Sequence, residues 1–331
     1  GGGKGGGGNS DYRLVKLPDE NGVTDLNGYA SAIHELRNST GTVVGLEVVG
    51  YLDDHAHYWL VDASGVVTTS SPLPLPAGAD PAIIFTNAND INNTGNVVGF
   101  GGLWPDNVPL FWATPVDDTV DLPTPDFADR GVATNINNNG LILGLLQSGD
   151  VDFIAAWGIK ENGDIVGPEV LASGIAEAPD VNDAGEVVAT LEYRAYKWNL
   201  DWDGETLNVT GSLALTTEIL DKQGHLQTIS LLRATAINEH GDICGQYRPD
   251  GGWLQGYLLT AEGALLDVAN LVDNRRRGTS ELSIFDLNDA ADVESIQIVG
   301  QAYIYQKDPG VVVEPETPVL LQGNQATDLQ K

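Results

Sequence analysis

The stretch Ile136–Gly144, INNNGLILG, places a glycine three residues after an asparagine, directly before a run of apolar residues. Asparagine favours the first position of a type I turn because its side chain can bond the backbone two residues further on. Glycine at the fourth position tolerates a positive φ, and the two residues together build a common hairpin loop. The stretch therefore predicts two antiparallel strands joined by a tight turn.

The same pattern recurs along the chain of 331 residues. An apolar pair follows the turn in most copies, which predicts a buried strand. Cys244, the only cysteine, stands in a column that valine fills in other copies, so we expect it in the core. The sixth copy has Ala291 in place of the glycine. The copies are Arg37–Gly45 (RNSTGTVVG), Ile91–Gly99 (INNTGNVVG), Ile136–Gly144, Val181–Ala189 (VNDAGEVVA), Ile237–Gly245 (INEHGDICG) and Leu287–Ser295 (LNDAADVES).

A tryptophan follows the turn asparagine by about 20 residues in the first three copies and by a shorter distance in the fourth. Leucine takes its place in the last two copies, as Leu259 and Leu321. Because an aliphatic residue substitutes for the ring, we expect a packing role rather than a row of sugar-stacking rings. The tryptophans predicted to lie in the core are Trp59, Trp112, Trp157 and Trp198.

An extended element with a central apolar residue ends each unit, as in Thr327–Leu329, and a similar stretch, Tyr12–Pro18, opens the chain. The chain thus begins and ends in the same phase of the repeat. Units of about 45–55 residues, each with roughly four short strands, fall in the range of β-propeller blades. We predict an all-β fold, a six-bladed β-propeller over residues 11–331 whose N- and C-terminal strands close the ring. An open β-solenoid is the alternative.

The unit resembles the HAF repeats of bacterial extracellular repeat proteins. The resemblance rests on the asparagine–glycine turn, the tryptophan, and the stretch His55–Trp59 (HAHYW), in which His57 replaces the phenylalanine of the name-giving triplet. It covers essentially Tyr12 to Leu329 and is loosest in the sixth copy. The resemblance implies a secreted or surface-attached protein and implies no catalytic residues.

The composition is strongly acidic, with 47 acidic and 16 basic residues and a formal net charge of −31. Such a surface repels nucleic acid and anionic membranes. No apolar run approaches the roughly 18 residues that a membrane span requires. The sequence contains no Gly-x-Ser-x-Gly elbow, phosphate-binding loop or paired-cysteine zinc motif. An enzyme, such as a secreted polysaccharide lyase or hydrolase, remains an alternative by analogy with other propellers alone.

The interval between turn asparagines lengthens between Asn182 and Asn238, and the extra residues lie in Asn199–Leu226. This segment begins NLDWDGE, which places oxygen-bearing side chains at alternate positions around a glycine, as in the first half of a calcium loop. Thr210 stands where an EF-hand has its bidentate glutamate, so an EF-hand is excluded. A simple hairpin turn is the alternative to a calcium site. The candidate Ca²⁺ ligands are Asn199, Asp201, Asp203 and Glu205.

Other features suggest further ligands. His55 and His57 alternate along a predicted strand, which is metal-ligand spacing with only two nitrogens. Trp104, Trp202 and Trp253 fall outside the core column, so we expect them to be exposed. Together with the loop at Asn199–Leu226, they support the alternative of an extracellular glycan- or calcium-binding module.

The chain opens with GGGKGGGG, and we treat residues 1–10 as a separate glycine-rich segment. Such a stretch is typical of a tether, for example after a lipid anchor upstream of Gly1. The chain contains no methionine, even at position 1, which favours removal of a secretory signal over a simple truncation. Glycine backbone also suits docking along a strand edge of another copy, and such head-to-tail contacts form filaments. We therefore expect an extracellular, non-catalytic, structural or self-assembling subunit.

Overall fold

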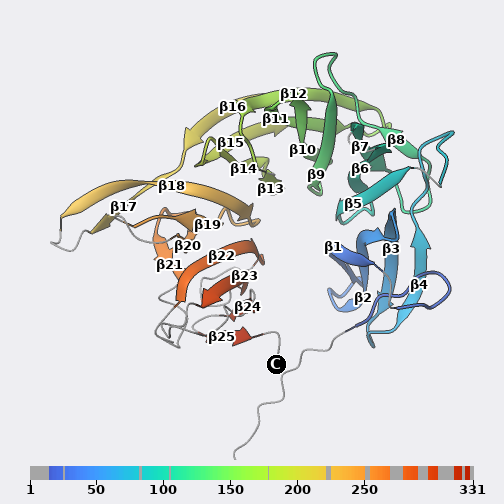
Figure 1. Ribbon diagram of the computed structural model, residues 1–331, viewed down its shortest axis with the longest axis horizontal. Helices are drawn as coiled ribbons and strands as arrows, with labels where there is room; N and C mark the ends of the chain where they lie inside the picture. Colours follow the sequence, from blue (N-terminus) through green and yellow to red (C-terminus); the bar gives the residue numbers. More distant parts are fainter. Residues whose placement is uncertain are drawn as a thin grey trace, which may run out of the picture.

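The computed structural model describes residues 15–24, 27–81, 84–103, 106–177, 179–220, 225–249, 254–268, 279–289, 297–304, 317–322 and 325–328. These residues form six antiparallel sheets arranged around a common centre (Figure 1). The fold is therefore an all-β β-propeller, as predicted. Within the described residues, no helix is long and apolar enough to cross a membrane.

The sheets are numbered 1 to 6 in chain order. Sheets 1 to 3 consist of β1 (Gly28–Arg37), β2 (Val43–Leu52), β3 (His55–Asp62) and β4 (Val67–Pro72); β5 (Phe85–Ile91), β6 (Val97–Leu103), β7 (Asp106–Trp112) and β8 (Thr119–Asp121); and β9 (Arg130–Ile136), β10 (Leu141–Ser148), β11 (Val151–Ile159) and β12 (Ile165–Gly174). Sheet 4 consists of β13 (Asp180–Val181), β14 (Glu186–Leu191), β15 (Arg194–Trp202) and β16 (Leu207–Ala214). Sheet 5 consists of β17 (Thr216–Leu220), β18 (Leu226–Ile237), β19 (Ile243–Tyr247), β20 (Gln255–Leu259) and β21 (Leu265–Asp267). Sheet 6 consists of β22 (Thr279–Leu287), β23 (Gln297–Ile304), β24 (Thr317–Gln322) and β25 (Gln325–Asp328).

The strands of each sheet follow one another outward from the centre, where the first strands β1, β5, β9, β13 and β22 lie (Figure 1). Sheet 5 differs because its β18 is long. Residues Leu231–Ile237 of β18 pair with β19, whereas Leu226–Ser230 pair with β17. The extra residues noted in the sequence thus help to form a β17–β18 hairpin that projects beyond the other sheets (Figure 1).

The repeated turn has the predicted geometry. The glycine has a positive φ of 76° to 83° in Gly41, Gly95, Gly140, Gly185 and Gly241. In each turn the glycine N–H donates to the carbonyl of the asparagine three residues earlier. The asparagine side chain accepts the expected backbone bonds as well: Asn137 Oδ1 accepts from the N–H of Asn139 at 3.0 Å and of Leu141 at 2.9 Å.

The asparagines also join neighbouring sheets, which the sequence did not predict. The side-chain amide of Asn92 donates to the carbonyl of Asn137 at 3.0 Å, and that of Asn137 donates to the carbonyl of Asn182 at 2.9 Å. Asn182 and Asn238 continue the series toward the following turns. We call this series, from Asn92 to Asn288, the asparagine ladder. It holds five consecutive turns in a fixed arrangement.

The tryptophan column is part of the core, as predicted. Trp59, Trp112, Trp157 and Trp198 are all buried, and Leu259 takes the equivalent place in sheet 5. Cys244 is also buried, and its burial raises the pKa of its thiol to about 12. This thiol therefore stays protonated at neutral pH.

Three tryptophans donate their indole N–H to the carbonyl of a proline in the preceding connection. The bonds are Trp59 to Pro18 at 2.6 Å, Trp112 to Pro74 at 2.8 Å and Trp157 to Pro123 at 2.8 Å. A leucine precedes each proline and packs against the same sheet, as Leu17, Leu73 and Leu122. Sheets 1, 2 and 3 are thus each anchored to the segment that leads into them.

Five apolar clusters join the consecutive sheets, one cluster for each neighbouring pair. A sixth cluster lies on the other face of sheet 1 and contains Val48, Leu52, Trp59 and Val61. Val15 and Leu17 pack against it. The N-terminal residues 15–18 therefore occupy, on sheet 1, the place that Leu73–Pro74 occupies on sheet 2.

The asparagine ladder yields a stability prediction. Asn137→Ala removes two turn bonds and the bond to Asn182 and leaves buried backbone groups unpaired, so we expect a loss of about 2–4 kcal/mol in the free energy of unfolding. Urea denaturation followed by circular dichroism measures this loss.

Asn38→Ala is the matched control. Asn38 makes the same two turn bonds, to Thr40 and Thr42, but it is exposed. Among the described contacts, its side-chain amide reaches no neighbouring sheet. We expect a loss of about 1 kcal/mol, the usual value for a turn or cap residue. Equal losses in the two variants would contradict a stabilising role for the ladder.

Candidate functional site: the central channel

The first strands of sheets 1 to 4 and 6, together with β18 of sheet 5, surround a central cavity of about 570 Å³. Three aspartates line it: Asp90 from β5, Asp180 from β13 and Asp286 from β22. They come from sheets 2, 4 and 6, and each stands two residues before its turn asparagine. The described lining contains no basic side chain. The channel therefore gathers three carboxyl groups from alternate sheets.

Two of these carboxylates also bridge neighbouring sheets. Asp90 Oδ2 accepts the backbone N–H of Ile136 on β9 at 2.8 Å, and Asp180 Oδ2 accepts the N–H of Ile237 on β18 at 2.8 Å. The other oxygen of each accepts the N–H of the next residue in its own chain segment. These side chains therefore stabilise the packing of the inner strands besides facing the cavity.

Burial controls the ionisation of the three carboxyls. It raises the pKa of Asp90 from the ordinary 3.8 to about 7 and that of Asp180 to about 8, although the accepted N–H bonds oppose the change. The pKa of Asp286 is raised for the same reason. Part of the Asp286 side chain is exposed to the cavity, and the surrounding protein still removes enough water from its carboxyl to raise the pKa. Repulsion from Asp286 raises the pKa of Asp90 and of Asp180 further.

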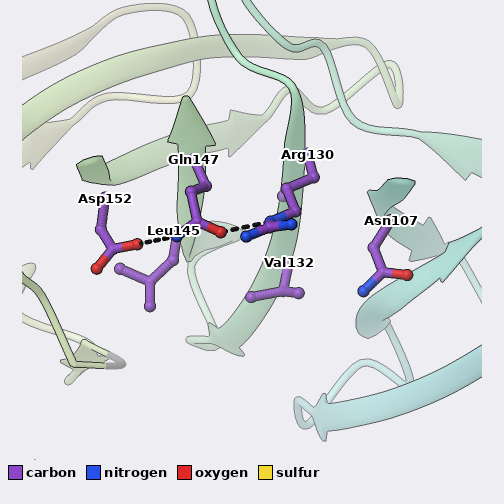
Figure 2. A pocket seen from close by; sticks show the side chains of 7 residues that line it. Asn107, Arg130, Val132, Leu145, Gln147 and Asp152 are labelled. Atoms are coloured by element: carbon purple, nitrogen blue, oxygen red, sulfur yellow. Dashed lines mark hydrogen bonds between the residues drawn. The ribbon is translucent and has the colours of Figure 1, made fainter. Parts of the chain in front are cut away.

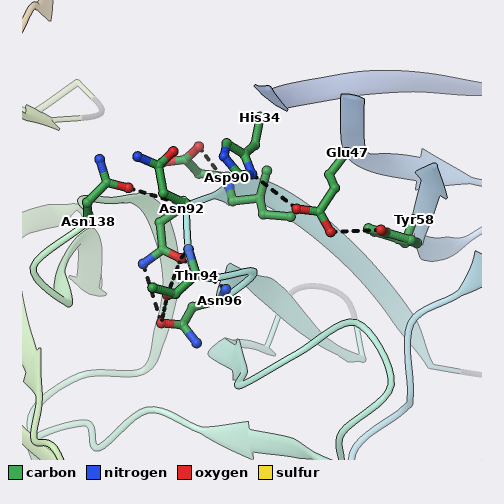
Figure 3. A network of polar contacts seen from close by, with 10 residues as sticks. His34, Glu47, Tyr58, Asp90, Asn92, Thr94, Asn96 and Asn138 are labelled. Carbon is green, nitrogen blue, oxygen red and sulfur yellow. Dashed lines mark hydrogen bonds and ion pairs between the residues drawn. The ribbon is translucent and has the colours of Figure 1, made fainter. Parts of the chain in front are cut away.

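Polar groups beside the channel are bonded to one another. The carboxylate of Glu47 contacts His34 Nδ1 at 3.1 Å and accepts the hydroxyl of Tyr58 at 2.8 Å. Figure 3 shows this chain next to Asp90 and the Asn92 turn, where Asn138 reaches over from sheet 3. Burial raises the pKa of the Tyr58 hydroxyl, so it stays a hydrogen-bond donor at neutral pH. The network joins β1, β2 and β3 within sheet 1.

The four candidate calcium ligands lie at one end of the β15–β16 hairpin. Asn199 and Asp201 are exposed on β15, whereas Asp203 and Glu205 lie in the turn. Asp203 Oδ1 accepts the N–H of Glu205 at 2.9 Å and of Thr206 at 2.7 Å, and these bonds lower its pKa. Asp203 thus serves as the turn-forming aspartate of the alternative interpretation.

The fourth candidate has a partner in the neighbouring sheet. Glu205 Oε2 lies 2.5 Å from Nζ of Lys160, at the end of β11. Across the residues that the structure describes, no three His, Cys, Asp or Glu side chains are grouped so that they could hold a metal ion. Calcium binding at this hairpin therefore stays a prediction, and it requires calcium to displace Lys160.

The two histidines are brought into the core of sheet 1. His57 is buried, its ring packs 4.7 Å from that of Trp59, and its Nε2 lies 2.9 Å from Ser70 Oγ. Burial lowers the pKa of His57 to about 4, so it is neutral at physiological pH. Nδ1 of His55 is buried without a partner.

Trp202 is not the exposed ring that the sequence predicted. Its indole N–H donates to the carbonyl of Asn139 at 3.1 Å, and its ring packs over Gly158, where a Cβ would lie 2.6 Å from ring carbons. The ring therefore joins sheets 3 and 4. Trp104 and Trp253 lie outside the described residues.

The sequence did not predict the channel aspartates as a group. Their signal was present in the aligned copies, because aspartate stands two residues before the turn asparagine in the second, fourth and sixth copies. Spacing along the chain alone does not show that these positions converge on one cavity.

The chain resembles solved structures in fold, whereas no protein-family model and no curated protein matches it. A puromycin hydrolase structure superimposes with a TM-score of 0.59 at 12% identity, covering 95% of this chain and 51% of that one. A mutant of the hydrolase complexed with PGG gives a TM-score of 0.58 at 12% identity, over 91% of this chain and 45% of that one. The Dos1 propeller covers 96% of this chain and 88% of its own at 9% identity, with a TM-score of 0.40. The chain thus spans about half the length of the hydrolase, and the similarity shows the fold alone.

The channel carboxyls predict an unusual pH dependence. Their folded pKa values lie above the unfolded value, so they stabilise the fold fully below about pH 4, and this contribution is lost as pH rises toward about 8. We expect the free energy of unfolding to fall by several kcal/mol, on the order of 5, between about pH 5 and about pH 8, because each pKa unit corresponds to about 1.4 kcal/mol. Urea titrations across this range test the slope. Asp180→Asn should flatten it, whereas Asp203→Asn, in an exposed turn, should leave it unchanged.

Calcium binding is tested by calorimetric titration. Because Lys160 competes for Glu205, we expect Lys160→Ala to bind calcium more tightly than the wild-type chain, by a few-fold. Asp203→Ala should abolish the heat. The absence of heat in both the wild type and Lys160→Ala would leave the hairpin with a structural role only.

Proposed function

We propose that the protein is a secreted or cell-surface, non-catalytic β-propeller that serves as a structural, self-assembling subunit. The resemblance to HAF repeats supports the location. The structural role is supported by hydrogen bonds between sheets. The amides of turn asparagines donate such bonds, and the carboxyls of two channel aspartates accept them. These groups stabilise a rigid scaffold rather than facing a substrate.

The observation that carries self-assembly is the projecting β17–β18 hairpin. β17 pairs with β18 on one side, and within the described sheet it lies at the edge. Leu226 at the start of β18 is 61% exposed, and Leu213 on the adjacent β16 is 65% exposed. An edge strand with exposed apolar side chains is a template for pairing with another chain. A second copy of this protein would satisfy both the edge and the leucines.

We further propose that six blades close into a ring. Residues 15–18 already pack on sheet 1 in the manner of the inter-sheet connections Leu73–Pro74 and Leu122–Pro123. The N-terminal segment is therefore suited to complete the interface between sheets 6 and 1. Residues 1–10, outside the described part, would then extend from the ring as a tether or as an assembly segment, in line with the expectation for the glycines.

A glycan- or calcium-binding module is the second candidate function. The candidate ligands Asn199 and Asp201 have exposed side chains on one strand, which favours access to a cation. A lyase or hydrolase has weaker support, because the match to puromycin hydrolase is a likeness of fold and the chain spans half of that protein.

Negative-stain microscopy and sedimentation velocity test the assembly proposal. We expect the full chain to form fibres or defined oligomers and Leu226→Lys to reduce them to single discs, because a buried charge at the interface opposes pairing. Val116→Lys is the matched control, since Val116 is 82% exposed in a loop away from the hairpin.

Deletion of residues 1–10 separates the two possible assembly elements. Oligomers lost only on this deletion would assign assembly to the glycine-rich segment, and those lost only in Leu226→Lys would assign it to the hairpin. A wild-type chain that stays monomeric at high concentration would contradict self-assembly.

A further inference from the structure

A second cavity, of about 270 Å³, lies between sheets 2 and 3. Its polar lining comes from Arg130 at the start of β9, Gln147 near the end of β10, Asp152 near the start of β11 and Asn107 near the start of β7. These strand ends lie opposite the repeated turns, which follow β9 and precede β10. The cavity is therefore separate from the asparagine ladder and from the central channel.

A chain of hydrogen bonds fixes the orientation of Arg130. Its Nε donates to Gln147 Oε1, and Gln147 Nε2 donates to Asp152 Oδ1 at 2.9 Å (Figure 2). Asp152 Oδ2 accepts the backbone N–H of Ala176 at 3.1 Å. No bond to the two Nη groups of Arg130 is found among the described residues. The guanidinium is thus held through one nitrogen, and two nitrogens remain available on the cavity side.

Asn107 faces the same cavity from sheet 2. The residue is 7% exposed, and its Oδ1 is buried without a hydrogen-bond partner. The amide nitrogen Nδ2 of Asn107 is directed toward the cavity, whereas Oδ1 points away from it (Figure 2). A ligand that accepts hydrogen bonds would therefore pair with both Asn107 and Arg130. Figure 2 shows Asn107 and Arg130 on adjacent walls, with Val132 and Leu145 forming the apolar part.

Elsewhere in the chain, an arginine that is bonded to a glutamine in the same way has a carboxylate partner. Arg233 on β18 also bonds a glutamine on the paired strand, Gln246, through Nη1 at 3.3 Å. Its Nη2 lies 3.0 Å from the carboxylate of Glu177, which precedes sheet 4. An arginine held by a cross-strand glutamine thus binds a carboxylate in one place. Next to Arg130, the neighbouring sheet offers the uncharged Asn107 instead.

We propose that the cavity between sheets 2 and 3 binds a small hydroxycarboxylate of monosaccharide size. Its carboxylate pairs with the Nη groups of Arg130, and a hydroxyl oxygen accepts a hydrogen bond from Asn107 Nδ2. Val132 and Leu145 contact its carbon skeleton. The net charge of the chain, −31, disfavours polyanions, so the ligand carries a single charge. This site is independent of assembly through the β17–β18 hairpin.

Isothermal titration with D-glucuronate tests the proposal on the full chain. We expect binding to the wild type, weakened roughly tenfold or more in Arg130→Gln, because the paired charge is lost. Arg233→Gln is the matched control and should bind as the wild type does. D-glucose, which lacks the carboxylate, and acetate, which lacks the hydroxyls, should both bind more weakly than glucuronate.

Asn107→Asp gives a second, opposite test. It places a carboxylate opposite Arg130, as Glu177 stands opposite Arg233, so it should abolish glucuronate binding and raise the melting temperature. Circular dichroism checks that each variant is folded. The proposal is overturned by an absence of glucuronate binding to the wild type up to about 10 mM. Unchanged binding in folded Arg130→Gln, or equal binding of glucose, would overturn it too.

Discussion

The hydrogen bond from a turn asparagine to the carbonyl of the next turn, made by Asn92, Asn137, Asn182 and Asn238, is the interaction on which the arrangement of the sheets depends. A four-stranded sheet has two apolar faces, and packing of these faces is not directional. The hydrogen bond from the asparagine amide is directional, so it fixes the orientation in which one sheet packs on the next. Since the same side chain also forms its own turn, a sheet with the correct turn is at the same time prepared to dock on its neighbour.

The tryptophan bonds act on the outer half of sheets 1 to 3, and the ladder acts near the inner half. The apolar clusters extend over both halves, since they include residues of the inner strands β5 and β9. Trp112 illustrates the outer half: its ring fills the cluster between sheets 1 and 2, and its N–H binds Pro74 in the connection between the same sheets. Asp90 and Asp180 add a third set of contacts at the channel wall. These aspartates keep their hydrogen-bond role while retaining protons more strongly than an exposed carboxyl would.

The sequence predicted well what repeats at short range. The turn glycines, the buried tryptophans and the buried Cys244 each follow from a local pattern or from a column of the repeat. The prediction for Trp202 was wrong because its position depends on Gly158 of another sheet, whose missing side chain makes room for the ring. The candidate calcium residues were local too, but Lys160, which pairs with Glu205, lies 45 residues earlier. The channel aspartates required three distant copies to converge, which only the assembled fold shows.

The ladder bonds from Asn92 and from Asn137 span the same sequence separation of 45 residues, and the bond from Asn182 spans 56. Docking one sheet on its predecessor therefore closes a loop of nearly constant length. Because the entropy of loop closure grows slowly with length, each addition carries a similar cost, and the longer interval that includes the β17–β18 hairpin adds little. The chain can fold by adding one sheet at a time, and contacts between residues close in the sequence favour a fast folding rate. Insertions at the rim leave this order unchanged, so the rim can vary among such proteins while the ladder is kept.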